Sequence, residues 1–445
     1  MGIKYMQNDI IKDITKECTD ENPANNMLIS ENISLSFNSQ HSKHNSNVLV
    51  LGSYGFGEDY RYAIPNILNA SHSFIVTDPK GEIYKETHQI LEEKNYNIQV
   101  LNVVDFDKSM HYNPLSIIQQ QYESKSTSYE ISIAKLVEIF ETEYNKEYCS
   151  CPFWGTSQKT ILRFVIKYLL YTNTGSKEIT FTDIIDVFNK IADLLNSDKC
   201  EYEDVKQELG LSEEEFCRDL QTFFMGGVKT KKAVLVNCII MLQPFTIHSF
   251  DQISKKDDIK ENNIDFDKLC QDKSALFIIT STTDFTFNFW IKSLIMQLMD
   301  YCIQRRTNIL KDFPKAQFSH IQFFIDDFYT RIIDLGAKMS VIRKYNIGIT
   351  LCFQCLSQIR DIYKEESDII ISNCDTVIYM GGEDEETMNF ITNKSEIKTG
   401  SSLKKPQTIN FNELYYLSNE NCAVVIRGFA PIIDKKIYRN DKEGL

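Results

Sequence analysis

The stretch that decides the fold is Asn47-Val-Leu-Val-Leu-Gly-Ser-Tyr-Gly-Phe-Gly-Glu-Asp59, in the first quarter of a 445-residue chain. Its apolar run, closed by Gly52, is typical of a short buried strand. A glycine-rich turn follows, and the next residues, to about Ala70, have the spacing of a helix. A strand, a glycine-rich turn and a helix are the usual setting of a phosphate-binding loop, because the first N–H groups of the helix point at the phosphates.

Further strands and helices alternate after this turn. We expect strands at Ser73–Thr77 and Ile98–Val104, with a helix at Ile83–Lys94 between them. This alternation indicates an α/β fold with a central, mostly parallel sheet. Later strands are expected at residues 274–280, 321–325, 347–353, 376–380 and 422–427.

The chain divides into regions of different pattern. Apolar residues recur with helical spacing through 126–258, which predicts an inserted all-α domain. The α/β domain would then consist of 47–125 and 259–445. Residues 1–46 are polar, with little periodicity, and we expect an arm outside the core.

Composition is that of a globular protein, with 42% hydrophobic and 25% charged residues. The net charge is -14, whereas proteins that bind duplex DNA over a wide surface are usually basic, so we expect any DNA contact to be local. No run approaches the ~18 apolar residues of a membrane span, and the N-terminus lacks a signal-peptide profile. These features predict a cytoplasmic protein, at most peripheral at the membrane through partners.

Twelve cysteines without a secretion signal are expected to be reduced thiols. Cys238, Cys302 and Cys374 lie in apolar stretches, where a thiol packs as a small hydrophobe. Cys352 and Cys355 form a C-x-x-C at the end of a predicted strand, not at the helix N-terminus that would lower a thiol pKa. We expect packing there, with redox chemistry or metal binding as the alternative.

The glycine-rich turn departs from a phosphate-binding loop at its last two positions. Gly52 and Gly57 match the spacing of G-x-x-x-x-G-K-[S/T], with Gly55 between them. Glu58 stands where a lysine contacts the phosphates, and Asp59 stands where a hydroxyl binds Mg²⁺. A unit charge 4 Å from a phosphate contributes ~4 kcal/mol at an effective dielectric near 20, so reversing its sign shifts binding by roughly 8 kcal/mol before relaxation.

Two interpretations of this loop stay open. In one, it is a tight turn between strand and helix that binds no nucleotide. In the other, it binds ATP and Mg²⁺ weakly, with Asp59 as a cation ligand and Arg61 turned back towards the phosphates.

A second predicted strand, Ser319–Ile325, ends in two carboxylates, Asp326 and Asp327. Beside a bound nucleotide the first would hold Mg²⁺ and the second would polarise the attacking water. Asp327 is one methylene shorter than a glutamate, so we expect a poorly placed base. The alternative is a solvated acidic strand end.

Several short motifs follow one another in a specific order. They are Asn47–Gly52 with its glycine loop, Pro65-Asn66, Thr77–Glu82, His111–Pro114, Pro152–Trp154, Thr283–Phe289, Ile369–Asp375 and Tyr379–Gly382. From about residue 25 to 438 this order resembles that of the TraG/TraD-type coupling proteins of type IV secretion. The resemblance implies a RecA-like P-loop NTPase fold whose all-α domain handles substrate recognition.

The resemblance also implies roles. Family members form hexameric ring ATPases that bring relaxase-bound DNA to a type IV secretion channel. Gly52, Gly57 and Asp326 match nucleotide and Mg²⁺ positions. Arg343 matches the arginine that reaches a neighbouring subunit's nucleotide, and Gln354 matches a sensor glutamine. Without the resemblance, these two would be interpreted as a surface ion pair and a strand-end amide.

The chain also departs from the family pattern. Besides the loop and Asp327, Tyr345 replaces a second arginine, and the N-terminal membrane anchor has no counterpart. We therefore expect a coupling-protein-like component whose ATP binding or hydrolysis is weakened or lost. The alternatives are a working but atypical ATPase, a non-hydrolysing docking or regulatory subunit of a homo- or hetero-hexamer, and an inactive remnant on a mobile element.

Overall fold

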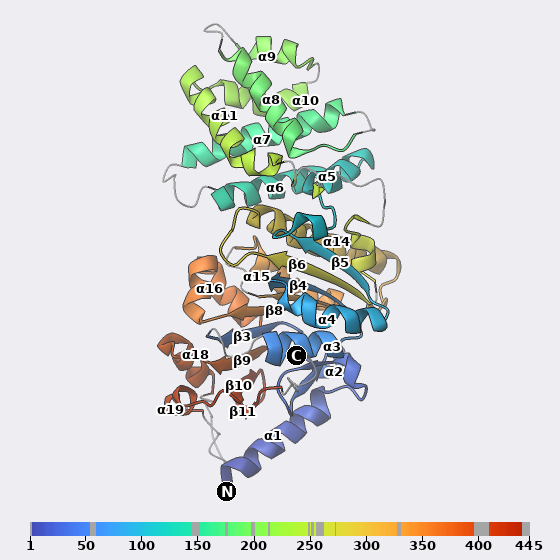
Figure 1. The fold of residues 1–445 in the computed structure, drawn as a ribbon, viewed down its shortest axis with the longest axis vertical. Helices are drawn as coiled ribbons and strands as arrows, with labels where there is room; N and C mark the ends of the chain where they lie inside the picture. The colour runs from blue at the N-terminus through green and yellow to red at the C-terminus, as the bar shows by residue number, and fades with distance from the viewer. Residues whose placement is uncertain are drawn as a thin grey trace. The chain divides into compact units, whose positions relative to one another are not determined.

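The chain forms two compact units, each described here by itself (Figure 1). The computed structural model describes residues 2–53, 59–144, 152–173, 177–196, 201–211, 214–247, 250, 253–254, 262–271, 273–326, 331–395 and 409–437. Unit 1 comprises Met1–Val104, Asp265–Thr282 and Met299–Leu445, and unit 2 comprises Asp105–Ile264 and Thr283–Leu298. Unit 2 begins earlier than the all-α domain expected at 126–258, because helix α5 (Pro114–Glu123) already packs against α6 (Ser128–Tyr144).

Unit 1 is built on a nine-stranded sheet with the order β11-β10-β9-β3-β8-β7-β4-β6-β5. Its strands are β3 (Val48–Gly52), β4 (Ser73–Pro79), β5 (Asn97–Asn102), β6 (Ser274–Thr280), β7 (Ile321–Ile325), β8 (Ile347–Phe353), β9 (Thr376–Gly381), β10 (Asn421–Ile426) and β11 (Ile432–Lys435). The strands from β9 to β5 pair in parallel, and β10 and β11 are antiparallel. Strands β3, β6, β7, β8 and β9 are buried at every residue, as expected for parallel strands covered on both faces.

Helices complete unit 1. They include α1 (Gly2–Cys18), α2 (Ser39–Ser42), the π-helical turn η2 (Asp59–Ala63), α3 (Ile64–Asn69), α4 (Glu82–Glu93), α13 (Phe266–Leu269), the C-terminal part of α14 (Asn288–Asp312), α15 (Leu335–Val341), the 3-10 turn η6 (Ile342–Tyr345), α16 (Leu356–Tyr363), α17 (Ser367–Ser372), α18 (Glu385–Ser395) and α19 (Phe411–Tyr415). Helix α3 follows β3 through η2, so the glycine-rich turn lies between a central parallel strand and its helix, as the sequence predicts.

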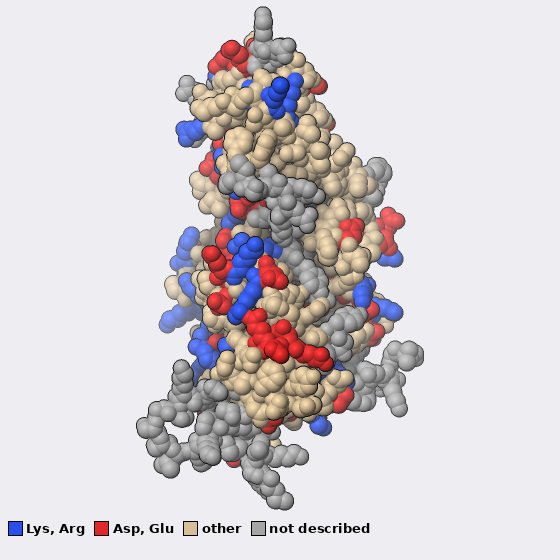
Figure 2. Space-filling model, turned by 90° about the vertical axis from the view of Figure 1, so that its left-hand side faces the viewer, with Lys and Arg blue, Asp and Glu red and all other residues tan. Residues whose placement is uncertain are grey.

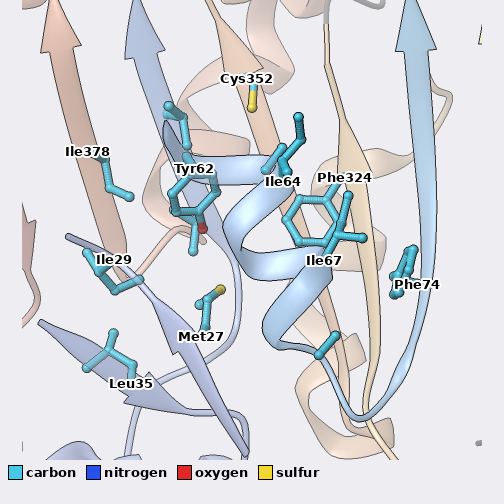
Figure 3. Packing of buried hydrophobic residues seen from close by; sticks show 14 of the residues in the cluster. Met27, Ile29, Leu35, Tyr62, Ile64, Ile67, Phe74, Phe324, Cys352 and Ile378 are labelled. Carbon is cyan, nitrogen blue, oxygen red and sulfur yellow. The ribbon is translucent and has the colours of Figure 1, made fainter. Parts of the chain in front are cut away.

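Segment 1–46, expected as a polar arm, instead packs into the core of unit 1. It forms α1 and a small antiparallel pair, β1 (Asn26–Leu28) and β2 (Ser34–Ser36). Its apolar side chains join the cluster around the fully buried Tyr62 (Figure 3). The strands are too short to show a period. Helix α1, however, has Ile10, Ile14 and Cys18 at helical spacing, a signal that the sequence does contain. The buried residues include Ile14, Cys18, Met27, Ile29 and Leu35.

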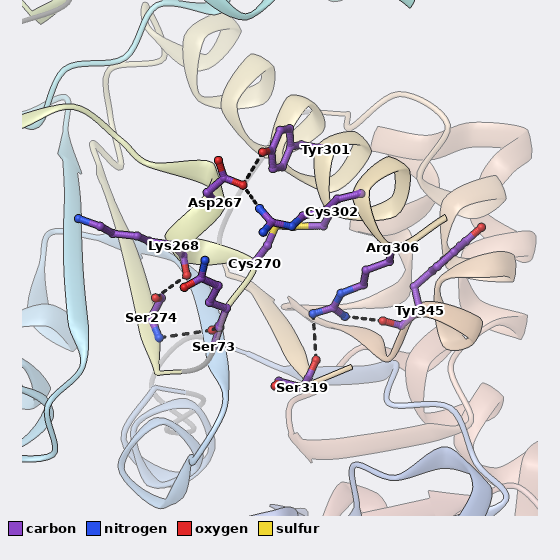
Figure 4. Close-up of a disulfide and its surroundings, with 12 residues drawn as sticks. Ser73, Asp267, Lys268, Cys270, Ser274, Tyr301, Cys302, Arg306, Ser319 and Tyr345 are labelled. Atoms are coloured by element: carbon purple, nitrogen blue, oxygen red, sulfur yellow. Dashed lines mark hydrogen bonds and ion pairs between the residues drawn. A yellow bond between two sulfur atoms is a disulfide. The ribbon is translucent and has the colours of Figure 1, made fainter. Parts of the chain in front are cut away.

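Cys270 and Cys302 form a disulfide, which corrects the expectation that all cysteines are reduced (Figure 4). Cys270 follows α13 and Cys302 lies in α14, with Cα atoms 6.0 Å apart. The two residues are 32 positions apart in the sequence, and spacing alone does not reveal such a pair. Cys352 and Cys355 are free, and Cys352 is buried in the core cluster.

Unit 2 is helical. Its further helices are α7 (Pro152–Thr172), α8 (Phe181–Leu194), α9 (Tyr202–Glu208), α10 (Glu214–Phe224) and α11 (Val228–Leu242). Aromatic rings meet in its core, with Phe140 and Phe289 at 4.7 Å and Phe181 and Phe245 at 5.0 Å between centroids. Among the described residues of both units, no helix has the length and apolar content needed to cross a membrane.

Candidate functional site

The predicted site residues of unit 1 follow neighbouring strands at one edge of the sheet, here called the carboxyl edge. Gly52 closes β3, Gln354 comes directly after β8, and Asp326 comes directly after β7. Strand β8 lies between the other two. Because neighbouring strands are about 4.8 Å apart, the three positions line up along this edge. A parallel sheet therefore brings together residues that are far apart in sequence.

The phosphate loop itself is described only in part. Gly55, Gly57 and Glu58 lie outside the described residues, as does Asp327. The described backbone resumes at Asp59, the first residue of η2. The described residues on either side of the loop therefore end β3 at the carboxyl edge and begin η2, which leads into α3.

Ser53, the first residue of the loop, is held against strand β9. Its N–H donates to the carbonyl of Gly381 at 3.0 Å. Gly382 has a φ of +147°, and a Cβ there would lie 2.5 Å from Ser53 Oγ. The Ser53 hydroxyl could rotate away from such a Cβ, so it is the positive φ at position 382 that favours glycine. The Tyr379–Gly382 motif contains this glycine pair, but the sequence alone indicated no role for it.

The Thr77 hydroxyl fixes the backbone of Asp326. Its Oγ1 accepts from the Asp326 N–H at 2.7 Å and donates to the Asp326 carbonyl at 2.9 Å. Thr77 is fully buried in β4, and Asp326 is half-buried at the end of β7. The arrangement sets the position from which the Asp326 carboxylate leaves the sheet. Sequence reasoning missed Thr77, whose only signal was its place in the Thr77–Glu82 motif.

The Asp78-Pro-Lys-Gly-Glu82 segment is a turn that starts helix α4. Asp78 is fully buried, and its carboxylate accepts from the N–H of Ile83 at 3.1 Å and of Tyr84 at 2.7 Å. Gly81 has a φ of +75°, which suits glycine. These bonds satisfy donors at the first turn of the helix, so Asp78 acts as a cap.

Arg61 does not turn back towards the loop, which corrects one expectation for weak nucleotide binding. Its guanidinium donates to both carboxylate oxygens of Glu420 at 3.0 Å, and to the carbonyl of Asn419 at 3.3 Å. The hydrogen bond and the positive charge of Arg61 hold the pKa of Glu420 below its usual range. Glu420 directly precedes β10, so this pair is part of the same edge.

Acidic side chains follow the strand next to the loop. Glu383 and Asp384 follow β9 after Gly382, and Asp384 Oδ2 accepts from the N–H of Thr387 at 2.8 Å. The basic residue Lys80 lies farther from the loop, because it follows β4, three strands away from β3. The described part of the carboxyl edge beside the loop is therefore predominantly negative.

Beyond this edge, charges of both signs lie close together. Figure 2 shows acidic and basic side chains gathered next to one another on the face that carries α16 and α18. A groove there is lined by Arg360, Glu385, Glu386 and Lys394, and Arg360 pairs with Glu386. Because opposite charges pair within it, this face has little net charge.

Arg343 lies at the opposite edge, here called the amino edge. It belongs to η6, directly before β8, and its Nη2 donates to the Ser39 carbonyl at 2.9 Å. The seven residues of β8, at ~3.3 Å each, span ~23 Å between the edge that carries Arg343 and the edge that carries Gln354. The structure therefore does not bring Arg343 together with Gly52 and Asp326 within one chain.

Solved structures with the same fold were found by comparison. TrwBΔN70, a bacterial conjugative coupling protein in an unbound form, is 13% identical with a TM-score of 0.63, over 96% of this chain and 92% of that chain. TrwB in complex with the ATP analogue ADPNP gives a TM-score of 0.63 at 12% identity, with the same coverage. VirB4 of Thermoanaerobacter pseudethanolicus gives 0.57 at 12% identity, over 94% of this chain and 97% of that chain. The RecA-like P-loop fold with an all-α domain is thereby confirmed.

Sequence comparison identifies the family. No curated protein sequence matches the chain. A family model described as "Type IV secretory system Conjugative DNA transfer" matches residues 1–437. The match spans nearly the whole chain and confirms the resemblance to coupling proteins inferred from the motifs. The chain belongs to the conjugative DNA transfer family of the type IV secretory system.

Proposed function

We propose that this chain is a coupling-protein-like component that links relaxase-bound DNA to a type IV secretion channel, and that its own phosphate loop binds ATP weakly or not at all. The observation that carries the second part is the pair Glu58-Asp59 at the two positions where a phosphate-binding loop has lysine and a hydroxyl residue. A carboxylate at the lysine position repels the phosphates that a lysine would attract.

The surroundings of the loop support this proposal. Arg61, the cation closest in sequence to the loop, is engaged by Glu420, and Glu383 and Asp384 add negative charge. A triphosphate does not fit this set of charges. No hydrolysis step follows from an arrangement in which the phosphate-contacting positions are acidic.

Other parts of the site remain suited to their proposed roles. Asp326 would hold Mg²⁺ if a nucleotide were bound, with Asp327 as the base and Gln354 as the sensor at the neighbouring strand end. Arg343, at the far edge, would act on the nucleotide of a neighbouring subunit. A chain whose own loop binds no nucleotide would thus still supply Arg343 to a neighbouring subunit that binds ATP in a mixed hexamer. We place such a complex at the cytoplasmic side of the membrane, reached through partners.

Thermal unfolding with and without Mg-ATP tests the loop. A ligand at 100 times its Kd adds ~2.7 kcal/mol to the free energy of unfolding. We expect any change in Tm at millimolar ATP to be the same in the unmodified chain and in the Asp326→Asn variant. A clear rise in Tm that disappears when Asp326 is replaced by Asn would show that the loop edge binds nucleotide and would refute the second part of the proposal.

The coupling role needs a separate experiment. The immobilised chain should retain the relaxase bound to DNA, and subunits of the secretion channel, both from the same mobile element. A variant with Arg343→Ala serves as the control for the subunit contact, and it should retain the relaxase but weaken mixed-ring assembly. Capture of neither partner would favour the inactive remnant over the docking or regulatory role.

A further inference from the structure

A cavity of about 1160 Å³ opens at the amino edge of the sheet in unit 1. Its lining comes from the segment Asp20–Lys43, from the residues that precede β4, β7 and β8, and from α15 and η6. It is here called the amino-edge cavity. The volume is large enough for a nucleotide-sized ligand. Neither the motifs nor the family match assigns it a role.

Three rings in mutual contact form one wall of the cavity. The centroids of Phe37 and His72 lie 4.2 Å apart, those of Phe37 and His320 lie 4.4 Å apart, and the two histidine rings lie 5.0 Å apart. All three side chains line the cavity and are more than nine-tenths buried. The wall therefore contains two imidazoles where apolar packing alone would favour hydrocarbon.

The two histidines differ in their partners. His320 lies 2.8 Å from Gln322 Oε1 and 3.1 Å from Asn346 Oδ1. Neither ring nitrogen of His72 has a hydrogen-bond partner among the described residues. Buried polar groups nearly always have a partner, because leaving one unsatisfied destabilises the fold. An unpartnered imidazole in the wall of a cavity points to a ligand that supplies the missing bond.

Positive charge surrounds the cavity. Lys43, Arg343 and Lys344 line it, and Asp20 is the acidic residue of the lining. Asp20 Oδ1 already accepts from the N–H of Asn22 at 2.9 Å. In a chain with a net charge of -14, this local surplus of cations favours an anionic ligand.

A buried arginine adds to this charge. Arg306 is 2% exposed and donates to the carbonyl of Ser319 at 2.9 Å (Figure 4) and to that of Asn346 at 3.3 Å. Both acceptor residues line the cavity. It also donates to the Tyr345 carbonyl. The guanidinium therefore holds the starts of β7 and β8 in place and contributes positive potential from behind the wall.

The remaining lining is rich in neutral donors and acceptors. Amides and hydroxyls of this kind pair with phosphate and sugar oxygens. They include Asn25, Asn38, Gln40, Ser71, Ser319 and Ser340.

We propose that the amino-edge cavity binds a phosphate-bearing ligand, with Lys43 and Lys344 pairing with its charge and His72 donating a hydrogen bond to it. Burial lowers the pKa of His72 well below its usual value, so the ring is neutral and offers one donor and one acceptor. A free nucleotide and the backbone of a DNA strand share this chemistry. The proposal concerns the edge opposite the phosphate loop and does not depend on the state of that loop.

Three probes test the proposal, all without Mg²⁺: inorganic phosphate, dAMP and a (dT)12 oligonucleotide. Binding is measured by thermal shift and by calorimetry on the full chain and on a variant with Lys43→Glu and Lys344→Glu. A matched control carries Lys12→Glu and Lys85→Glu, which change the same charge on the exposed faces of α1 and α4. We expect at least one probe to bind, with at least tenfold weaker binding in the cavity variant and an unchanged Kd in the control.

The source of the phosphate follows from which probe binds. Binding of dAMP indicates a mononucleotide, and binding of (dT)12 without dAMP indicates a strand. Replacing His72 by Phe should weaken the same binding while raising Tm without a probe, because the buried unpaired nitrogens are removed. No binding of any probe, or an equal loss in the control variant, would overturn the proposal.

Discussion

The two edges of one parallel sheet carry opposite charge. At the carboxyl edge Glu383 and Asp384 follow β9, and the nearby cation Arg61 is paired with Glu420 before β10. At the amino edge Lys43, Arg343 and Lys344 surround a cavity. Anions usually bind at the carboxyl ends of parallel strands, beside helix N-termini. The topology of the sheet determines where the loops meet, whereas the charges of their side chains determine which ligands they bind.

Internal bonds hold both edges, so the difference between them lies in their charge. The hydroxyl of Thr77 and the carboxylate of Asp78 fix turns at the carboxyl edge. At the amino edge, Asp375 pairs with Arg427 at 2.7 Å, and the disulfide joins Cys270 to α14. Because the backbone is held at both edges, a charge substitution at either edge should change ligand binding without moving the strand ends.

Restoring the expected loop residues should have the largest effect, because it reverses the charge of the carboxyl edge. We expect Glu58→Lys with Asp59→Thr to gain Mg-ATP binding, by up to roughly 8 kcal/mol before relaxation. Calorimetric titration with Mg-ATP measures the gain. The pair Glu92→Lys and Glu93→Thr, exposed on α4, makes the same charge change away from the loop and should gain nothing. If the variant with both loop substitutions still failed to bind Mg-ATP, the geometry of the loop, and not its charge, would be what prevents binding.

Breaking the disulfide should weaken the amino edge. A cross-link that closes a loop of this length contributes about 2–4 kcal/mol, because it restricts the unfolded chain. We expect reduction, or Cys302→Ala, to lower the free energy of unfolding by about that amount in denaturant titration. Cys374→Ala, at a free buried cysteine, separates loss of the cross-link from loss of packing. Digestion without reductant should release Cys270 and Cys302 in one linked peptide, and separate peptides would show that they are not joined.

Acidification should destabilise the amino edge through its buried histidines. Burial lowers the pKa of His72 well below its usual value and that of His320 to about 4, and His72 also faces His320, while His320 also faces Arg306. The unfolded chain therefore binds more protons between pH 6.5 and about 4, and stability falls as the pH drops through this window.

The expected slope is about 1.4 kcal/mol per pH unit for each histidine. We expect His72→Phe to lose roughly one histidine's share of this slope in unfolding titrations at pH 6.5 and 5. The variant His41→Gln, at an exposed histidine, should keep the slope of the unmodified chain. Identical slopes in all three proteins would show that His72 is not buried in neutral form.

Removing the Thr77 hydroxyl should have the smallest effect. Thr77→Val leaves the Asp326 N–H without its acceptor, which should cost about 1–2 kcal/mol in denaturant titration. Thr15→Val, on the exposed side of α1, should change stability by less than about 0.5 kcal/mol. If both variants behaved alike, Thr77 would not fix the strand end that carries Asp326.

Much of the sheet was predictable because parallel strands are buried on both faces. The apolar runs at 274–280, 321–325 and 347–353 are strands with those same bounds. Gly52 and Asp326 were predicted at strand ends from the local pattern, whereas Gln354 was assigned from the resemblance to coupling proteins. The order of the strands, which no local pattern predicts, brings the three positions to one edge.

Contacts between distant segments were not predictable. Arg61 turns towards Glu420, which is 359 positions away, and no local pattern announces that pair. The wall of the amino-edge cavity joins Phe37, His72 and His320 from three separate segments. The N-terminal segment joins the core through α1 and through two strands too short to show a period. Each of these depends on tertiary packing, which the spacing of apolar residues does not encode.

Hydrogen exchange in the presence of millimolar Mg-ATP tests most directly whether the amino edge binds the anion and the carboxyl edge does not. The method reports binding at both edges in one experiment. We predict no added protection in peptides that cover 52–63, and slower exchange in peptides that cover 37–43 and 340–346. Added protection at 52–63, with none at the amino edge, would contradict the account.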